Sequence, residues 1–267
     1  MDRFRIKSFL LATLLVLLSS CSIKEDRTGC PCWLIVDLSK VLDAGITPPS
    51  LWNHGLTVAL FSSSHVIDSL SLGYEEAHAE YGFHVAKGDV GVVGILGRDR
   101  AEISGPAIRI PEGCQADPLY LSSQWVPCYG EEARAVLEVL KQFSRVEIWG
   151  LDTFSCRMEV TAGCSGLDLL TAEALEGPFR YQLTCDEEGA CRFRMPRQRE
   201  DDLKILLYDA DGQLDNSIPL GRYMTDIGYD WDAPSLADVS IRVDFVTATV
   251  NITVGDWTHA YVFPYNL

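Results

Sequence analysis

The sequence predicts an all-β protein of two β-sandwich domains, placed behind an N-terminal export signal. Short runs that alternate apolar and polar residues recur along the chain, and such alternation is typical of half-buried strands. Pro-rich breaks and Asp-Gly turns separate these runs. Many short strands with turns between them are typical of sandwiches rather than of βαβ units.

The first twenty residues have the order of a secretory signal. Arg3, Arg5 and Lys7 make a basic start, and an uncharged, Leu-rich run follows from Phe9 to Leu18. This run is too short to cross a bilayer core, which needs about 20 apolar residues. We therefore expect residues 1–20 to be a cleaved signal peptide.

The stretch Leu18-Ser19-Ser20-Cys21 resembles a bacterial lipobox. In that kind of signal the Cys sulfur receives a diacylglyceryl group, the chain is cut before the Cys, and the new amine is acylated. Several acyl chains hold a protein firmly, because each buried methylene contributes about 0.8 kcal/mol. Cys21 is the expected lipid attachment site, carrying acyl chains such as palmitate. The alternative is an ordinary signal followed by an unrelated cysteine.

Residues 21–29 are polar and charged, which suits a short solvated tether. Within them, Lys24-Glu25-Asp26 resembles the Lys-acid-acid lipoprotein export signal of the Bacteroidota. In that group the signal sends lipoproteins to the outer face of the outer membrane. The sequence thus predicts a lipid-anchored, surface-facing protein of the cell outer membrane, with a plain tether as the alternative.

The expected mature chain is strongly acidic. Removing residues 1–20 takes away three basic residues and one acid, so the formal charge goes from −16 to −18. Nucleic-acid binding depends on Lys and Arg contacts to phosphate, so this charge argues against a nucleic-acid partner. Anionic lipid also repels such a chain, so the membrane contact must come from the acyl anchor.

The chain has nine cysteines, and eight remain if Cys21 is lipidated. An even number in an exported protein suggests disulfides. Their spacing suggests three local pairs, with connectivity left open and free thiols as the alternative: Cys185 with Cys191, Cys156 with Cys164, and Cys114 with Cys128. Structural zinc favours Cys pairs spaced by two to four residues, or Cys with His. No such pair occurs in this sequence, so a zinc site is not expected.

The expected first domain spans residues 30–145. Its candidate strands, read from period-two alternation and turn residues, are 33–38, 56–61, 66–72, 81–85, 90–96, 107–110 and 119–121. Residues 131–143 are ambiguous: their composition and apolar spacing favour a helix, yet an all-β chain can override propensity. Residues 144–149 read as a strand, and the domain boundary is placed there.

The expected second domain spans residues 146–267. Its candidate strands are 156–161, 179–184, 192–195, 203–208, 217–220 and a long ribbon over 239–254 that breaks at 247–249. Asp209, Asp211 and Gly212 suggest either a calcium loop or a β-turn. The turn explains them better, because the later acidic ligands of a calcium loop are missing.

The sequence contains no P-loop, no His-Glu-x-x-His and no Gly-x-Ser-x-Gly motif, so the protein is not expected to be an enzyme and no cofactor or metal is expected. Glu76, His78 and Glu80 could share one strand face as a metal or acid–base site, but a solvated acidic loop is the preferred interpretation. Six tryptophans could form a glycan platform. Trp33, Trp149 and Trp257 are expected in the core, which leaves three candidates in loop-like context: Trp52, Trp125 and Trp231.

Several segments, in order, resemble the FimB/Mfa2 family of fimbrial anchor lipoproteins of the Bacteroidota. After the lipobox they are Cys30-Pro31, residues 55–61, 81–88 running into Val92-Val93, 203–208, Asp211-Gly212, 218–220 and 252–257. The order and spacing carry the resemblance, which covers most of the mature chain. This sequence departs from the family in its many cysteines.

The resemblance implies two β-sandwich domains of the transthyretin-like, Greek-key type. It also implies a protein at the base of a fimbria that holds the fimbria on the outer membrane and limits its length. Fimbrial subunits are then the expected partners, docked by strand addition into a sheet. The alternative function is a surface glycan-binding lipoprotein of a polysaccharide-capture system.

Overall fold

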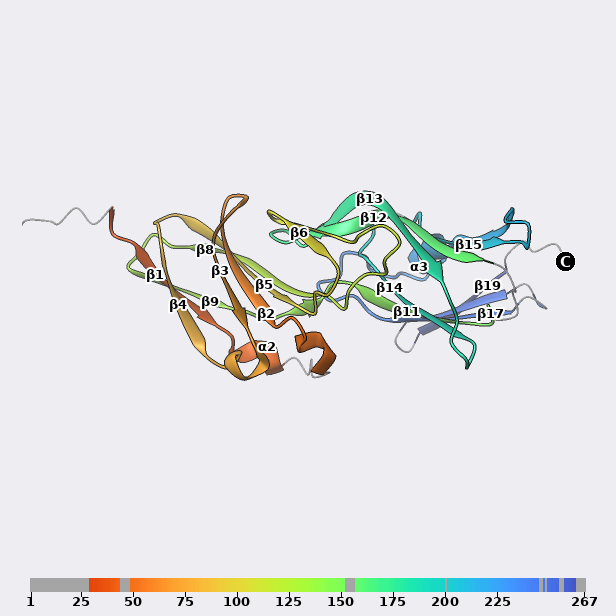
Figure 1. Cartoon of the computed structure of the whole chain (residues 1–267), viewed down its shortest axis with the longest axis horizontal. Helices are drawn as coiled ribbons and strands as arrows, with labels where there is room; N and C mark the ends of the chain where they lie inside the picture. Colours follow the sequence, from red (N-terminus) through yellow and green to blue (C-terminus); the bar gives the residue numbers. More distant parts are fainter. Residues whose placement is uncertain are drawn as a thin grey trace, which may run out of the picture.

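A computed structural model describes residues 29–43, 49–151, 157–199, 201–244, 247, 249–254 and 257–262. Strands dominate these residues and form four sheets, which confirms the all-β prediction. The molecule is elongated, with the strands of the first half of the chain at one end and those of the second half at the other (Figure 1). Its short helices are α2 (Ser39–Asp43), η3 (Pro49–Trp52), η4 (Tyr74–Glu76) and α3 (Leu220–Asp226). No helix in the described part is long and apolar enough to cross a membrane.

The first half forms a sandwich of two sheets. The β1 sheet has the order β4 (Glu80–Val85), β1 (Cys32–Asp37), β9 (Glu132–Val136). The β5 sheet has the order β10 (Leu140–Lys141), β8 (Tyr120–Pro127), β5 (Asp89–Leu96), β2 (Leu56–Ser62), β3 (His65–Leu72). Alternate residues of β1 are fully buried, as expected of a strand with one face on the core. They join residues of β2, β5 and β8 in one apolar cluster.

The second half forms another sandwich. The β11 sheet has the order β14 (Ala190–Met195), β11 (Ser144–Trp149), β17 (Val239–Asp244), β18 (Thr249–Val254), β19 (Trp257–Val262). The β12 sheet has the order β16 (Leu214–Ile218), β15 (Lys204–Tyr208), β12 (Met158–Asp168), β7 (Ala107–Arg109), β6 (Glu102–Ser104), and β13 (Ala174–Leu183) also pairs with β12. Each half has a strand that lies between an antiparallel and a parallel neighbour. Strand β1 pairs antiparallel with β4 and parallel with β9, and β11 pairs antiparallel with β14 and parallel with β17.

The β5 sheet lies between the two sandwiches and contributes side chains to both cores. Strand β5 is a continuous apolar run because both of its faces are buried: Val92 and Leu96 lie in the first core, whereas Val93 and Ile95 lie in the second. The hairpin β6–β7 also crosses between the halves, since β7 pairs with the end of β12. Residues 102–109, expected in the first domain, therefore belong to a sheet of the second half.

Residues 131–143 form strand β9 and the short β10 rather than a helix. Strand β9 pairs in parallel with β1, and the backbone N–H of Trp33 donates to the carbonyl of Glu131 at 2.8 Å. Ala135 and Leu137 are buried in the first core. Long-range pairing with β1 and burial thus outweigh the helix propensity of this segment, which is a weak preference per residue.

Candidate functional site

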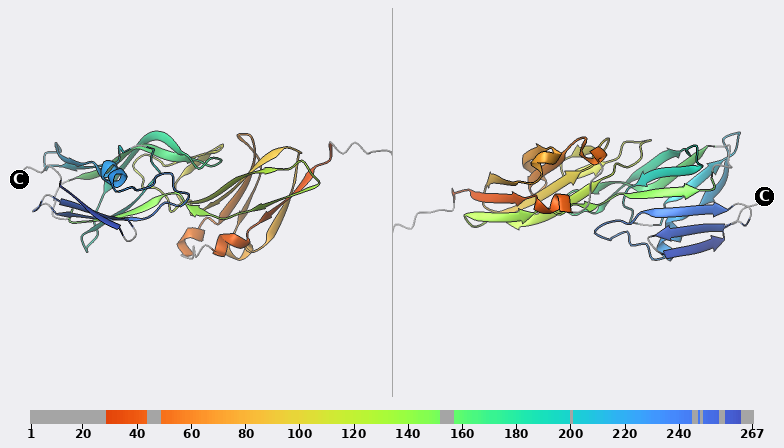
Figure 2. Two further views of the ribbon diagram at one scale, coloured as in Figure 1. Left: turned by 180° about the vertical axis from the view of Figure 1, so that it is seen from behind. Right: turned by 90° about the horizontal axis from the view of Figure 1, so that it is seen from below.

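The predicted membrane attachment lies outside the described residues. Cys21, the expected lipid site, and Lys24, Glu25 and Asp26, the expected export signal, all precede Gly29, where the described chain begins. The described chain therefore starts eight residues after Cys21 and enters the first sandwich at Cys32, the first residue of β1. This start lies at one end of the molecule, and the C-terminal strands lie at the opposite end (Figure 2).

At the opposite end, β19 forms an open sheet edge. It pairs with β18 from Thr249↔Val262 to Val254↔Trp257, and no described strand pairs with its other side. Thr258, His259 and Ala260 are exposed, and Val262 is 78% exposed. An edge strand presents unpaired backbone N–H and C=O groups, which form a template for a strand from another chain.

Side chains hold β19 in place against the sandwich. The rings of Tyr261 and Tyr223 stack at 4.5 Å and 9° between ring planes, and the Tyr261 hydroxyl donates to the Tyr223 carbonyl at 3.0 Å. Burial raises the pKa of Tyr223 and of Tyr261. The Thr253 and Thr258 hydroxyls lie 2.9 Å apart across the two strands. The edge is therefore presented by a strand fixed in register.

The sequence pattern did not predict this edge strand. The terminal residues Tyr261, Phe263 and Tyr265 alternate at period two, but the expected ribbon stopped at Val254. The available signal was the same alternation that predicts the other strands, continued past Trp257. Phe263 and Tyr265 lie outside the described residues.

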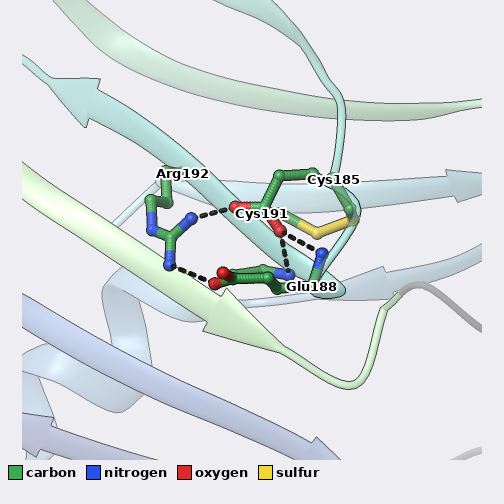
Figure 3. The surroundings of a disulfide bond; sticks show 6 residues. Cys185, Glu188, Cys191 and Arg192 are labelled. Atoms are coloured by element: carbon green, nitrogen blue, oxygen red, sulfur yellow. Dashed lines mark hydrogen bonds and ion pairs between the residues drawn. A yellow bond between two sulfur atoms is a disulfide. The ribbon is translucent and has the colours of Figure 1, made fainter.

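The predicted Cys185–Cys191 disulfide is confirmed. Figure 3 shows it in the turn that leads from β13 into β14, next to Arg192 and Glu188. Asp186 stabilises the turn by accepting hydrogen bonds from the Glu188 and Ala190 N–H groups, both at 3.0 Å. The bond closes a short local loop at the rim of a sheet, as the spacing predicts.

The predicted Cys114–Cys128 disulfide is wrong, because the two cysteines are not bonded to each other and lie at different cores. The eight-residue strand β8 lies between them, and an extended strand of that length spans about 26 Å at about 3.3 Å per residue. Cys114 packs against the second core, whereas Cys128 is buried in the first. Cys164 is also a free, buried thiol, and its predicted partner Cys156 lies outside the described residues.

Two of the three tryptophans considered for a glycan platform pack against neighbouring side chains. Trp231 is only 8% exposed and packs edge-on against Tyr229 at 4.7 Å. Trp52 packs against the first core and meets Tyr74 edge-on at 5.3 Å. Trp125 is 47% exposed and remains a candidate. Trp33, expected in the core, is instead 38% exposed on the outer face of β1.

The polar residues considered for chemistry have structural partners. The Glu76 carboxylate accepts the Gly73 N–H at 2.8 Å, and Glu80 pairs with Arg134. His78 lies edge-on to Tyr74 at 5.9 Å. Asp209 accepts hydrogen bonds from the backbone N–H groups of Asp211 and Gln213, at 3.0 and 2.7 Å, in the turn between β15 and β16. The described residues contain no group of three His, Cys, Asp or Glu side chains that could hold a metal.

No protein-family model matches the sequence, and no curated protein matches it. Solved structures do share its fold. A candidate polysaccharide-binding protein from Bacteroides thetaiotaomicron is 12% identical and superposes with a TM-score of 0.62, over 86% of this chain and 98% of its own. A candidate adhesin from Bacteroides ovatus is 16% identical, with a TM-score of 0.58 over 90% and 97%.

The fimbrial anchor protein Mfa2 from Porphyromonas gingivalis is 12% identical, with a TM-score of 0.58 over 87% of this chain and 100% of its own. At these identities the similarity establishes the fold. The chain therefore has the fold of a fimbrial anchor protein and of a candidate adhesin, as its sequence resemblance implies.

Proposed function

We propose that the protein is an outer-membrane lipoprotein that anchors a fimbria at the cell surface. The observation that carries the proposal is the placement of two features at opposite ends of an elongated molecule: the start of β1, next to the expected tether, and the open edge of β19 (Figure 2). A membrane-proximal end and a distal docking edge are what an anchor requires. The fold shared with the fimbrial anchor Mfa2 supports the same function.

Docking occurs in this proposal by strand addition at β19. A donor strand from a fimbrial subunit forms main-chain hydrogen bonds with the edge, and side-chain contacts give specificity. Because Tyr261 and Thr258 fix β19 in register, a donor meets a preformed edge and loses less entropy on binding. An occupied edge leaves no further strand site at that end of the fimbria, which is how the anchor limits length.

The docking site is tested by placing a photo-crosslinking side chain at Thr258 or at Ala260, both exposed on β19. The matched control is Val66, which is 49% exposed on β3, the edge strand of the β5 sheet. We expect crosslinks to a fimbrial subunit from the two β19 positions and none from Val66. Crosslinks from Val66 alone would place the docking edge on the first sandwich and refute the role of β19.

The lipid anchor is tested with Cys21→Ala, with Cys30→Ala as the control because Cys30 is an exposed free cysteine nearby. We expect Cys21→Ala to move the protein out of the membrane fraction and Cys30→Ala to leave it there. If the Cys21→Ala protein stays in the membrane fraction, Cys21 is not the lipid attachment site that holds the protein there.

The export signal is tested by replacing Lys24, Glu25 and Asp26 with alanine. We expect the variant to stay in the membrane fraction while its cleavage by protease added to whole cells falls. Unchanged cleavage would show that these residues serve only as a tether.

We also propose that the protein acts by binding and not as an enzyme. The residues considered for chemistry all make structural contacts: Glu76 caps a helical turn, Glu80 forms an ion pair, His78 contacts a tyrosine ring and Asp209 stabilises a turn. This arrangement supports a structural role for them.

Glycan binding remains the second candidate, favoured by the exposed Trp125 and by the fold shared with a candidate polysaccharide-binding protein. Retention on columns of surface polysaccharides, compared between the wild type and Trp125→Ala, tests it. Retention that Trp125→Ala abolishes would favour this second function over the anchor.

A further inference from the structure

Two cysteine thiols that the sequence spacing did not pair lie together inside the first sandwich. Cys32 and Cys128 are both fully buried and belong to the same core cluster. The Cys32 thiol lies near enough to the Cys128 thiol to contribute, after burial, to the raised pKa of Cys128. They are 96 positions apart in the sequence, so local spacing gives no sign of the contact.

Backbone pairing brings the two residues together. Cys32 is the first residue of β1 and lies opposite Val85 of β4. Cys128 directly follows β8, and its N–H donates to the Gly88 carbonyl at 2.8 Å, just beyond the end of β4. The next residue of β1, Trp33, donates to Glu131 at 2.8 Å. The start of β1 is thus held between the end of β4 and the segment after β8.

We propose that Cys32 and Cys128 form a disulfide in the exported protein, linking the β1 sheet to the β5 sheet where the chain enters from its tether. The inference rests on the export that belongs to the proposed function. The confirmed Cys185–Cys191 bond supports it independently, because stable disulfides are typical of oxidising compartments.

The reaction needs a disulfide donor, such as the active-site disulfide of a thiol oxidase. The thiolate of one cysteine attacks the donor disulfide and forms a mixed disulfide, and the second thiolate then displaces the donor. One Sγ–Sγ bond forms and the donor disulfide bond breaks. Both cysteines are oxidised, and the donor leaves as a dithiol that takes up two protons.

Oxidation has to precede the closing of the sandwich. Both residues are fully buried in the folded protein, so a disulfide donor cannot reach either sulfur there. Burial, together with the neighbouring Cys32 thiol, also raises the pKa of Cys128 to about 11. Once formed, the bond is shielded from reductants because both residues are inaccessible.

The bond has a mechanical consequence for an anchor. Cys32 is eleven residues after Cys21, so a pull between the membrane and a docked fimbria enters the fold at the first residue of β1. A cross-link at that residue passes the load to the end of β8 in the opposite sheet. The pulling force then does not break the backbone hydrogen bonds that join β1 to β4 and β9.

The test is peptide mapping by mass spectrometry of the full chain purified from its native cells, alkylated under denaturing conditions without reduction. We expect a Cys32 peptide linked to a Cys128 peptide, alongside the Cys185–Cys191 link. If the Cys185–Cys191 link is present while Cys32 and Cys128 are alkylated, the proposed bond is refuted and export stands. If all four cysteines are alkylated, both the bond and the oxidising location are refuted.

Accessibility gives a second readout. A mild reductant added to the native protein should open Cys185–Cys191 first, because Cys185 is only half-buried, and should open Cys32–Cys128 only when denaturant is added. The Cys128→Ser variant should free one thiol at Cys32 and lower the Tm, whereas Cys114→Ser, at a half-buried free cysteine, should change neither. Equal Tm losses from the two variants would argue against a cross-link.

Discussion

Arg197 is a buried charged residue with several hydrogen-bond partners, and its removal tests how the two sandwiches are joined. Arg197 follows β14 and is only 4% exposed. Its guanidinium donates to the carbonyls of Trp231 and Ala233, the latter at 2.8 Å, and to Oε1 of Gln142 at 2.9 Å. Gln142 lies in the link between β10 and β11, so one side chain ties the junction of the two halves to the loop before β17.

The Arg197→Leu variant would leave three acceptors without their donor. A buried acceptor left unpaired costs about 1–3 kcal/mol. Leu also removes the cost of burying the charged guanidinium, whose Nε has no hydrogen-bond partner. The expected loss of stability is therefore about 2–4 kcal/mol.

Thermal unfolding followed by circular dichroism measures this loss. A change of 1 kcal/mol shifts the Tm by about 2–4 °C for 150–250 residues, so we expect Arg197→Leu to lower it by at least about 4 °C. Arg199→Leu is the control, because Arg199 is exposed and its ion pairs with Glu173 and Glu176 are 3.7 Å long. Such pairs contribute about 0–1 kcal/mol. Equal Tm shifts for both variants would refute the role assigned to Arg197.

Three further outcomes follow from side-chain contacts. Asp117 is buried and accepts backbone N–H groups from residues 99, 100 and 101 at 2.8–3.0 Å, so Asp117→Ala should cost about 2–4 kcal/mol in urea unfolding, and a cost below 1 kcal/mol would contradict this. Hydrogen bonds from Ser39, and then from Arg134, lower the pKa of Asp37 to about 2. Because the pKa is lower in the folded state, the ionised Asp37 stabilises the fold above about pH 4, and this contribution is lost as the pH falls towards 2. Asp37→Asn should flatten that part of the stability–pH curve, and an unchanged curve would argue against the assignment. Tyr261→Ala removes the stack on Tyr223, so hydrogen exchange should quicken in β19 but not in β11; uniform protection would contradict it.

Local patterns predicted much of the fold. The alternation in residues 203–208 and 239–254 and the apolar run in residues 90–96 correspond to strands β15, β17, β18 and β5. These segments were predictable because the side chains that determine them are neighbours in the sequence. The same holds for the Cys185–Cys191 bond, whose loop is short and closes on itself.

Features that depend on distant partners were not predictable in this way. Strand β9 forms because β1, almost one hundred residues earlier, offers a parallel partner. The β6–β7 hairpin joins the second sandwich through β12. Cys128 meets Cys32 rather than Cys114 because β8 is extended between the two predicted partners. The distal edge was missed for a related reason: that β19 lies at the end of its sheet follows only from the full strand order.

The measurement that tests the anchor most directly is electron microscopy of fimbriae in cells that carry Cys21→Ala in place of the wild type, with Cys30→Ala as the control. Attached and shed fimbriae are counted and their lengths measured. We predict that Cys21→Ala cells shed fimbriae into the medium, that the shed fimbriae are longer, and that Cys30→Ala cells resemble the wild type. Fimbriae that stay attached in normal number and length on Cys21→Ala cells would contradict the account.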